Sequence, residues 1–230
     1  ATFVVVPFSS SLIIADMNVG ILYLTAVTAL TVVGVLMAGW SSNNKWSLLG
    51  GIRSAAQVIS YEIPAGFAII PIVLLTGTLS MQEIIRAQGV YPWDWFIFYS
   101  PFTFVAALIF YVSALAEANR TPFDIPEAES ELVAGFATEY SGMRFALFFL
   151  AEWGTLYVIG AVMASLFLGG WQVPAWTDNL VLLNLSQFVL FFIKSFFWAF
   201  LAMWIRATLP RVRVDQLMSL CWKYLVPIGF

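Results

Sequence analysis

The sequence contains no histidine and a single cysteine, Cys221. Histidine is the usual axial ligand of a membrane haem and the commonest general base, so this chain offers neither. One cysteine cannot form an intramolecular disulfide, hold an iron–sulfur cluster or complete a cysteine zinc site. No Gly-x-Gly-x-x-Gly or Walker-type phosphate loop occurs either. We therefore expect no metal site in this chain, and we expect another polypeptide to supply any redox or nucleotide chemistry.

Charged residues are also scarce. They make up 10% of the 230 residues, whereas hydrophobic residues make up 61%, and the mean hydropathy is +0.90. A soluble protein of this length could not hide so much apolar surface. The sequence therefore predicts an integral membrane protein in contact with the lipid bilayer. A net charge of −3, with no basic stripe to neutralise phosphates, argues against nucleic acid as a partner.

Apolar stretches predict the spans, because a transmembrane helix needs about 20 such residues. Five stretches qualify, at residues 19–40, 55–78, 95–116, 145–168 and 180–205. The predicted fold is all-α, a polytopic transmembrane helix bundle that forms a single domain over residues 1–230. Ala1–Phe8 resembles the end of a preceding span and a further span is expected near Trp222, so we expect a fragment of a longer chain.

Basic residues are concentrated in alternate connections between these stretches. The connections 41–54, 117–144 and 206–223 carry Lys45, Arg53, Arg120, Arg144, Arg206, Arg211, Arg213 and Lys223. The connections 9–18, 79–94 and 169–179 carry only Arg86. By the positive-inside bias the first set faces the cytoplasm, and the expected location is the plasma (inner) membrane of a bacterium. The acidic loop 117–144 is then cytoplasmic, because acids contribute little to this bias.

Ionisable residues inside the spans are Glu62, Glu152 and Lys194. The glutamates are expected roughly 10–13 Å from the cytoplasmic ends of their helices, and Lys194 roughly 17 Å deep. A charge near the bilayer centre costs about 2.5–3.5 kcal/mol, so each requires pairing or hydration. With Glu117, which ends the third span, and Glu139, which precedes the fourth, they are candidates for a proton relay. The alternative is a set of buried pairs that fix helix packing.

Two prolines, Pro64 and Pro71, lie inside the second predicted span, and Pro64 follows closely after Glu62. Proline frees a backbone carbonyl and can kink a helix, and freed carbonyls in protein interiors are often hydrated. The pattern predicts a hydrated kink beside an acid, where protons could enter.

The loop 117–144 opens with the run Glu117-Ala-Asn-Arg-Thr-Pro-Phe-Asp-Ile-Pro-Glu-Ala-Glu129. A short helix is expected from Pro126, with Asp124 near its N-cap. The acids expected in its first turns are Glu127, Glu129 and Glu131. These carboxylates form either a funnel that leads protons toward the membrane acids or a solvated helix start.

Arginines gather again after the fifth span, at Arg206, Arg211 and Arg213. They anchor the topology of the chain at the cytoplasmic interface, or they form a docking surface for an acidic subunit or a polar headgroup. In the second case Asp215 would pair with one of the arginines and hold its side chain in place.

Together these motifs resemble the membrane subunit called H, or subunit 1, of respiratory complex I, the NADH:quinone oxidoreductase. The resemblance rests on Glu117–Leu132, Thr138–Ser141, Leu150–Glu152, Leu168–Trp171, Trp204–Gln216, Gly39–Gly50 and Ser60–Glu62. It runs in order over nearly the whole chain.

The resemblance implies a subunit of a proton-translocating enzyme that has no complete active site of its own. It implies that Glu62, Glu117 and Glu152 are buried acids that link quinone chemistry to proton transfer. The loop beside the quinone cavity would contain Arg120, Asp124, Glu127, Glu129, Glu131 and Glu139. The stretch facing the peripheral-arm subunits would contain Arg206, Arg211, Arg213 and Asp215. The expected substrate is ubiquinone or menaquinone, and iron–sulfur clusters, FMN and NAD are expected only on partner subunits.

The sequence departs from this family in its first complete span, where some members carry another acid and Thr28-Ala29-Leu30 has none. Besides a passive membrane anchor, whose acids glutamine could replace without consequence, two alternatives stay open. One is the equivalent subunit of a ferredoxin-, F420- or hydrogenase-linked complex, which the partner set would distinguish. The other is a secondary transporter using Glu62 and Glu152, which would predict an internal repeat with paired broken helices.

Overall fold

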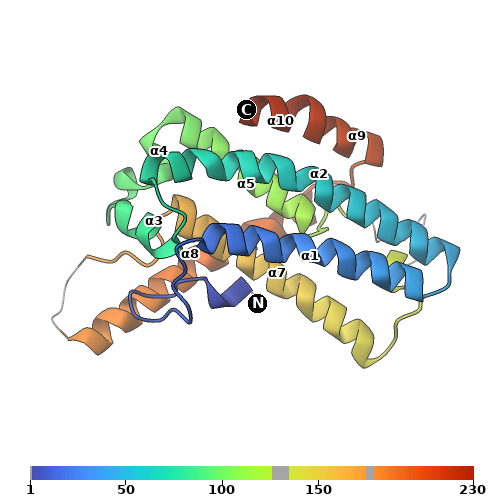
Figure 1. Cartoon of the computed structure of the whole chain (residues 1–230), viewed down its shortest axis with the longest axis horizontal. Helices are drawn as coiled ribbons and strands as arrows, with labels where there is room; N and C mark the ends of the chain where they lie inside the picture. Colours follow the sequence, from blue (N-terminus) through green and yellow to red (C-terminus); the bar gives the residue numbers. More distant parts are fainter. Residues whose placement is uncertain (1, 126–134, 175–178) are drawn as a thin grey trace.

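The structure is a computed structural model, and it describes residues 2–125, 135–174 and 179–230. Every regular element in these ranges is a helix, which confirms the all-α prediction (Figure 1). Helices long and apolar enough to cross a membrane are α1 (Gly20–Ser41), α2 (Lys45–Thr76), α7 (Met143–Phe167) and α8 (Leu180–Thr208). A shorter apolar helix is α5 (Pro101–Glu117). The short elements are η1 (Thr2–Val4), α3 (Met81–Ala87), η2 (Pro92–Asp94), α4 (Phe96–Tyr99), η3 (Gly135–Ala137), α9 (Val214–Ser219), the π-helix η4 (Leu220–Leu225) and α10 (Val226–Gly229).

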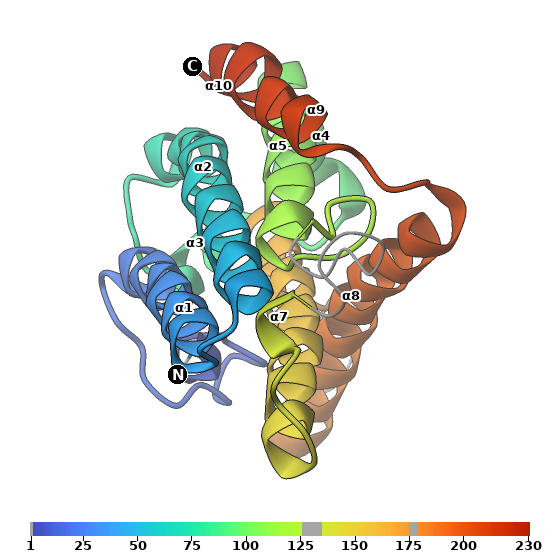
Figure 2. The ribbon, with the colours of Figure 1, turned by 90° about the vertical axis from the view of Figure 1, so that its right-hand side faces the viewer.

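The long helices form one bundle around α2. In the view along the bundle, α2 lies between α1 and α5, α7 and α8 lie side by side, and the C-terminal helices cover α2 and α5 (Figure 2). Tyr61 and Ile72 of α2, Phe110 of α5 and Phe167 of α7 belong to the shared apolar core. The bundle therefore buries the middle of α2 on several sides.

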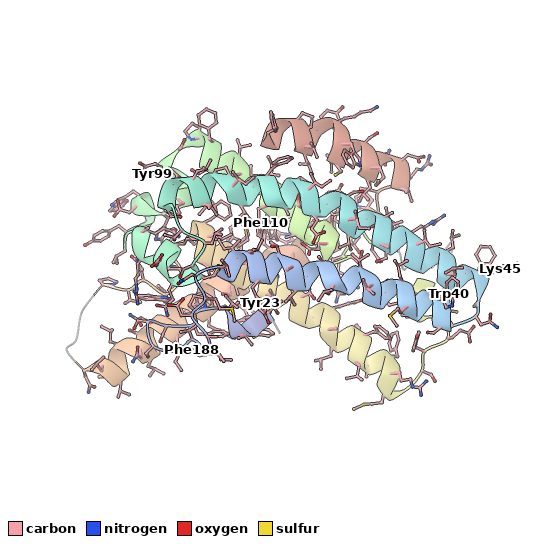
Figure 3. All side chains as sticks on the ribbon, viewed as in Figure 1. Tyr23, Trp40, Lys45, Tyr99, Phe110 and Phe188 are labelled. Atoms are coloured by element: carbon pink, nitrogen blue, oxygen red, sulfur yellow. The ribbon has the colours of Figure 1, made fainter. Side chains whose placement is uncertain are left out.

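The outer faces of the bundle are apolar as well. Leu30 and Met37 of α1 and Phe196 and Phe197 of α8 are exposed. Aromatic side chains such as Trp40 and Tyr99 occur toward opposite ends of the molecule (Figure 3). Apolar flanks with aromatic residues near the ends are typical of a lipid-exposed surface, so the chain is a membrane protein.

Alternate connections meet at opposite ends of the bundle, as the distribution of basic residues predicted. At one end, Asn44 donates to the Glu139 carboxylate at 2.8 Å, which joins the α1–α2 turn to the segment before α7. At the other end, the Gly169 amide donates to Gln88 Oε1 at 2.7 Å, which joins the segments that follow α3 and α7.

Helix α2 begins at Lys45, well before the predicted start near residue 55. The Asn44 side chain caps it by accepting from the Trp46 amide at 3.0 Å. Gly50 allows close packing, because a Cβ atom there would lie 2.8 Å from the Gly135 Cα atom. Contacts with α1 and η3 thus extend the helix through residues too polar to be recognised as part of a span. The sequence predicted that Glu62 lies near the start of its helix. In the structure it lies midway along α2.

The third predicted span is divided into α4 and α5. Ser100 between them is extended, with φ −149° and ψ 150°, as expected for a residue before proline. Ser100 and Thr103 form a capping box, and Pro101 occupies the first turn of α5, where no amide donor is needed. The break follows from local sequence, and α5 ends at Glu117 as predicted.

The terminal segments differ from the expected partial spans. In residues 2–18 the only regular element is η1, and Ser10 Oγ donates to Gln187 Oε1 of α8 at 2.9 Å. At the other end, helical structure starts at Val214, before the predicted Trp222, and continues through η4 to Gly229. The helix predicted from Pro126 lies outside the described residues.

Candidate functional site

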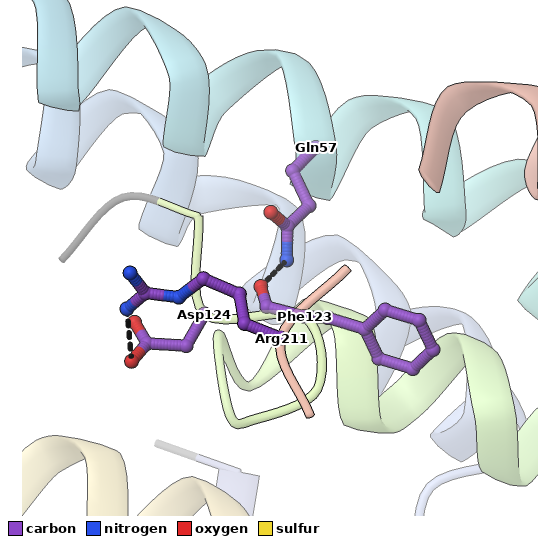
Figure 4. A network of polar contacts seen from close by, with 4 residues as sticks. All are labelled: Gln57, Phe123, Asp124 and Arg211. Atoms are coloured by element: carbon purple, nitrogen blue, oxygen red, sulfur yellow. Dashed lines mark hydrogen bonds and ion pairs between the residues drawn. The ribbon is translucent and has the colours of Figure 1, made fainter. Parts of the chain in front are cut away.

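The segment after α5 is held against α2 by a buried amide. Gln57 is 1% exposed, and its Nε2 atom donates to the Phe123 carbonyl at 2.8 Å (Figure 4). The same atom donates to the Ala116 carbonyl at 2.7 Å. Asn119 adopts a left-handed conformation with φ 51° and donates to Ser54 Oγ at 3.2 Å. The beginning of the acidic loop is therefore folded onto the membrane helices.

The same loop binds the segment that follows α8. The Arg211 guanidinium lies 3.1 Å from the Asp124 carboxylate (Figure 4). The Val212 amide also donates to the Pro122 carbonyl at 3.0 Å. Asp124 thus pairs with Arg211, and the helix near whose N-cap it was predicted lies outside the described residues. Asp215 was expected to fix an arginine, but Arg211 is held by Asp124.

Arg120 joins the loop to α7. Its side chain is buried, and its Nη2 atom lies 3.1 Å from Oε2 of Glu152. The guanidinium also lies 5.2 Å from the centre of the Trp153 ring. Among the described residues, its Nε and Nη2 atoms make no hydrogen bond, so the contact with Glu152 is an electrostatic attraction. The structure therefore unites one predicted loop residue with one predicted membrane acid.

Glu62 and Glu117 form a second cluster. Glu117, partly buried at the end of α5, lies within electrostatic range of Glu62 on α2 and near Thr28 of α1. Thr28 stands in the span where the sequence lacks an acid, and its hydroxyl donates to the Thr25 carbonyl of the same helix at 2.9 Å.

Glu62 also borders an open apolar groove of about 440 Å³ between α1 and α2. The lining includes Ile21, Ile69 and Val73, and Glu62 is the only ionisable residue among the described residues that form it. The acid therefore borders an apolar surface and also lies within electrostatic range of Glu117.

Glu139 lies apart from these acids. It is exposed, and its carboxylate accepts from Asn44 at the turn between α1 and α2. Arg206, Arg213 and Asp215 are exposed too, at the end of α8 and the start of α9. Glu127, Glu129 and Glu131 lie outside the described residues.

Lys194 is not brought together with the glutamates. It is 8% exposed, and its ammonium donates to the carbonyls of Leu168 at 2.7 Å and Gly170 at 3.1 Å, just beyond α7. It also lies 4.4 Å from the centre of the Trp95 ring. A cation at the C-terminal end of a helix is stabilised by the helix dipole, so these contacts support a capping role. Membership of Lys194 in a proton relay stays a prediction.

Replacing Lys194 by methionine is expected to lower the stability of the protein by about 1–3 kcal/mol, because the Leu168 and Gly170 carbonyls lose their donor. The thermal midpoint of the purified protein in detergent measures this loss. Lys223→Met, at an exposed position, is the matched control and should leave the midpoint unchanged. Equal midpoints for both variants would contradict the capping role.

The sequence analysis missed Gln57, Thr28 and Trp153. An uncharged polar residue within an apolar span is the one signal that could have pointed to Gln57 and Thr28, because such side chains need a partner in lipid. Nothing in the sequence distinguishes Trp153 from the other tryptophans. Among the described residues, no three His, Cys, Asp or Glu side chains gather to hold a metal ion.

Comparisons with known proteins agree with the motifs. A family model described as NADH dehydrogenase matches residues 1–230. The H subunit of the NADH-quinone oxidoreductase of Anaeromyxobacter dehalogenans is 58% identical over 247 residues, covering 99% of this chain and 59% of that protein. The H subunit of the Chlorobaculum tepidum enzyme is 52% identical over 237 residues, covering 99% and 66%. Subunit 8 of the same enzyme from Rhodothermus marinus is 48% identical over 235 residues, covering 97% and 68%.

The chain therefore spans less than two thirds of the length of the first two of these relatives. The family match extends over every residue of the chain, and the resemblance seen in the motifs is confirmed. This chain belongs to the NADH dehydrogenase family.

Proposed function

We propose that the chain forms part of the membrane subunit of a proton-translocating NADH:quinone oxidoreductase and borders the chamber in which quinone is reduced. The names of its relatives support this assignment, and they favour NADH as the donor over ferredoxin, F420 or hydrogen. The membrane is the inner membrane of a bacterium, with the loop 117–144 on the cytoplasmic side, where the basic connections meet.

The electron carriers belong to other subunits of the membrane and peripheral arms. An iron–sulfur cluster needs several thiolate ligands, and the one cysteine of this chain is buried. FMN and NAD are likewise assigned to partner subunits, because the sequence contains no Gly-rich phosphate loop. This chain contributes the acids, the loop and the lipid-embedded helices, and the exposed Arg206, Arg213 and Asp215 face the peripheral subunits.

The acids couple quinone reduction to proton transfer. Reduction of a quinone to a quinol takes up protons, which changes the charge beside the loop that carries Arg120 and Asp124. The observation that carries the proposal is the ion pair between Arg120 and Glu152, because it connects this loop directly to a membrane acid. A change of charge near Arg120 alters its attraction for Glu152.

Proton transfer then continues through the Glu117 and Glu62 pair. Glu117 stands at the end of α5, where the loop begins, and Glu62 lies midway along α2. Each unit by which the pKa of such a site changes corresponds to about 1.36 kcal/mol, so several coupled sites transmit a useful part of the redox energy. Lys194, whose ammonium donates to carbonyls beyond the opposite end of α7, stays a predicted member of the relay.

The proposal is tested in membrane vesicles that contain the assembled complex. In the complex that assembles, Glu62→Gln and Glu152→Gln should each lower proton translocation coupled to quinone reduction by about tenfold or more, because glutamine cannot carry the proton. Glu83→Gln, an exposed acid on α3, is the matched control and should pump normally. Unchanged pumping in both site variants would refute the relay.

A further inference from the structure

Pro64 leaves one backbone carbonyl of α2 without a helical donor. In an α-helix the amide of each residue donates to the carbonyl four residues earlier. Proline has no N–H group, so Pro64 cannot donate to the carbonyl of Ser60. Ser60 is only 6% exposed, and its carbonyl therefore needs a donor from within the protein.

The thiol of Cys221 supplies that donor. Its sulfur lies 3.1 Å from the Ser60 oxygen, and the side chain of Cys221 is fully buried. Cys221 belongs to the π-helix η4, where the chain makes a wider turn than in an α-helix. The next residue of α2 is bound to the same region, because the Tyr61 hydroxyl donates to the Leu217 carbonyl at 2.9 Å.

These contacts immediately precede Glu62. The carbonyl freed by Pro64 belongs to the same helical turn as this acid. We propose that Cys221 is a positioning residue for Glu62: its thiol replaces the amide that Pro64 lacks and fixes the turn that carries the acid. The inference rests on the proposed role of Glu62 and deepens it.

The partnership between Cys221 and Pro64 predicts a non-additive pair of substitutions. Cys221→Ala is expected to lower coupled turnover of the complete complex in membrane vesicles about fivefold, because a hydrogen bond worth about 1 kcal/mol is lost. It should also shift the pH dependence of that turnover. In a Pro64→Ala background the restored amide takes over the Ser60 carbonyl, so Cys221→Ala should then change turnover less than about twofold.

A matched control separates this effect from the loss of any buried polar side chain. Ser195 in α8 is fully buried and donates to the Phe191 carbonyl, which already has a helical amide as donor. Ser195→Ala should therefore leave the pH dependence of turnover unchanged.

Infrared spectroscopy tests the hydrogen bond of the thiol directly. The difference spectrum between wild type and Cys221→Ala isolates the S–H stretching band of Cys221, which should lie at the lower frequency of a hydrogen-bonded thiol. In Pro64→Ala it should move to higher frequency.

The outcomes distinguish the inference from the function on which it rests. Equal losses from Cys221→Ala in both backgrounds, or an S–H band that Pro64→Ala does not move, would overturn the positioning role. If Glu62→Gln stops pumping while Cys221→Ala leaves turnover and its pH dependence unchanged, only the positioning role fails. If Glu62→Gln pumps normally, the proposed function fails, whatever the thiol band shows about the hydrogen bond.

Discussion

An Arg120→Met variant should be destabilised by on the order of 3 kcal/mol, because the partly buried Glu152 carboxylate loses the guanidinium beside it. The methionine also forfeits the attraction between the cation and the Trp153 ring. The expected result is a lower thermal midpoint of the purified protein and a reduced amount of assembled complex in the membrane.

A double variant separates stability from function. Well-packed apolar residues often replace a buried ion pair without loss of stability, so Arg120→Met combined with Glu152→Met should recover most of the lost midpoint. It should still fail to pump protons, because the acid is gone. If the double variant is as unstable as the single one, Arg120 stabilises the protein through contacts other than the ion pair with Glu152.

A Gly160→Val variant should prevent stable packing of α7 against α8. Even one methyl group at this buried glycine would collide with the backbone carbonyl of Ser195 in the facing helix. A backbone atom cannot rotate away as a side chain does, so the helices must separate along their shared face. We expect a loss of at least about 3 kcal/mol, at the upper end of what overpacking costs, and little assembled complex in membrane extracts.

Gly154 in the same helix provides the matched control. A Cβ atom there would meet nothing within 4 Å, and alanine favours a helix over glycine by about 1 kcal/mol. Gly154→Ala should therefore assemble normally or slightly better. Normal assembly of Gly160→Val would show that α7 and α8 can pack at a greater distance than in this structure.

Most of the fold could be predicted, because length and hydropathy decide which segments cross a bilayer. The ends of the helices were harder to predict. Lys45 to Ser54 looked like a connection, since the stretch is polar and rich in glycine. Packing against α1 and η3 turns it into helix, and that gain depends on residues distant in the sequence.

The candidate site was predicted in its members but not in its pairings. Glu62, Glu117 and Glu152 could be recognised because ionisable residues in or beside lipid are rare and costly. Their separation in the sequence gave no sign that Glu62 would face Glu117 while Glu152 would be held by Arg120. Lys194 looked equivalent to the glutamates, yet its partners are carbonyls of another helix end.

The sequence by itself determined the membrane-embedded helical class, the positions of most spans and the identity of the unusual acids, because these follow from composition and from runs of neighbouring residues. Only the tertiary structure decided the partner of each charge, the reach of α2 and the use of Cys221 at the carbonyl that Pro64 leaves free. The physical reason is that a buried polar group is satisfied by whatever atom the packing of distant helices brings within hydrogen-bonding distance.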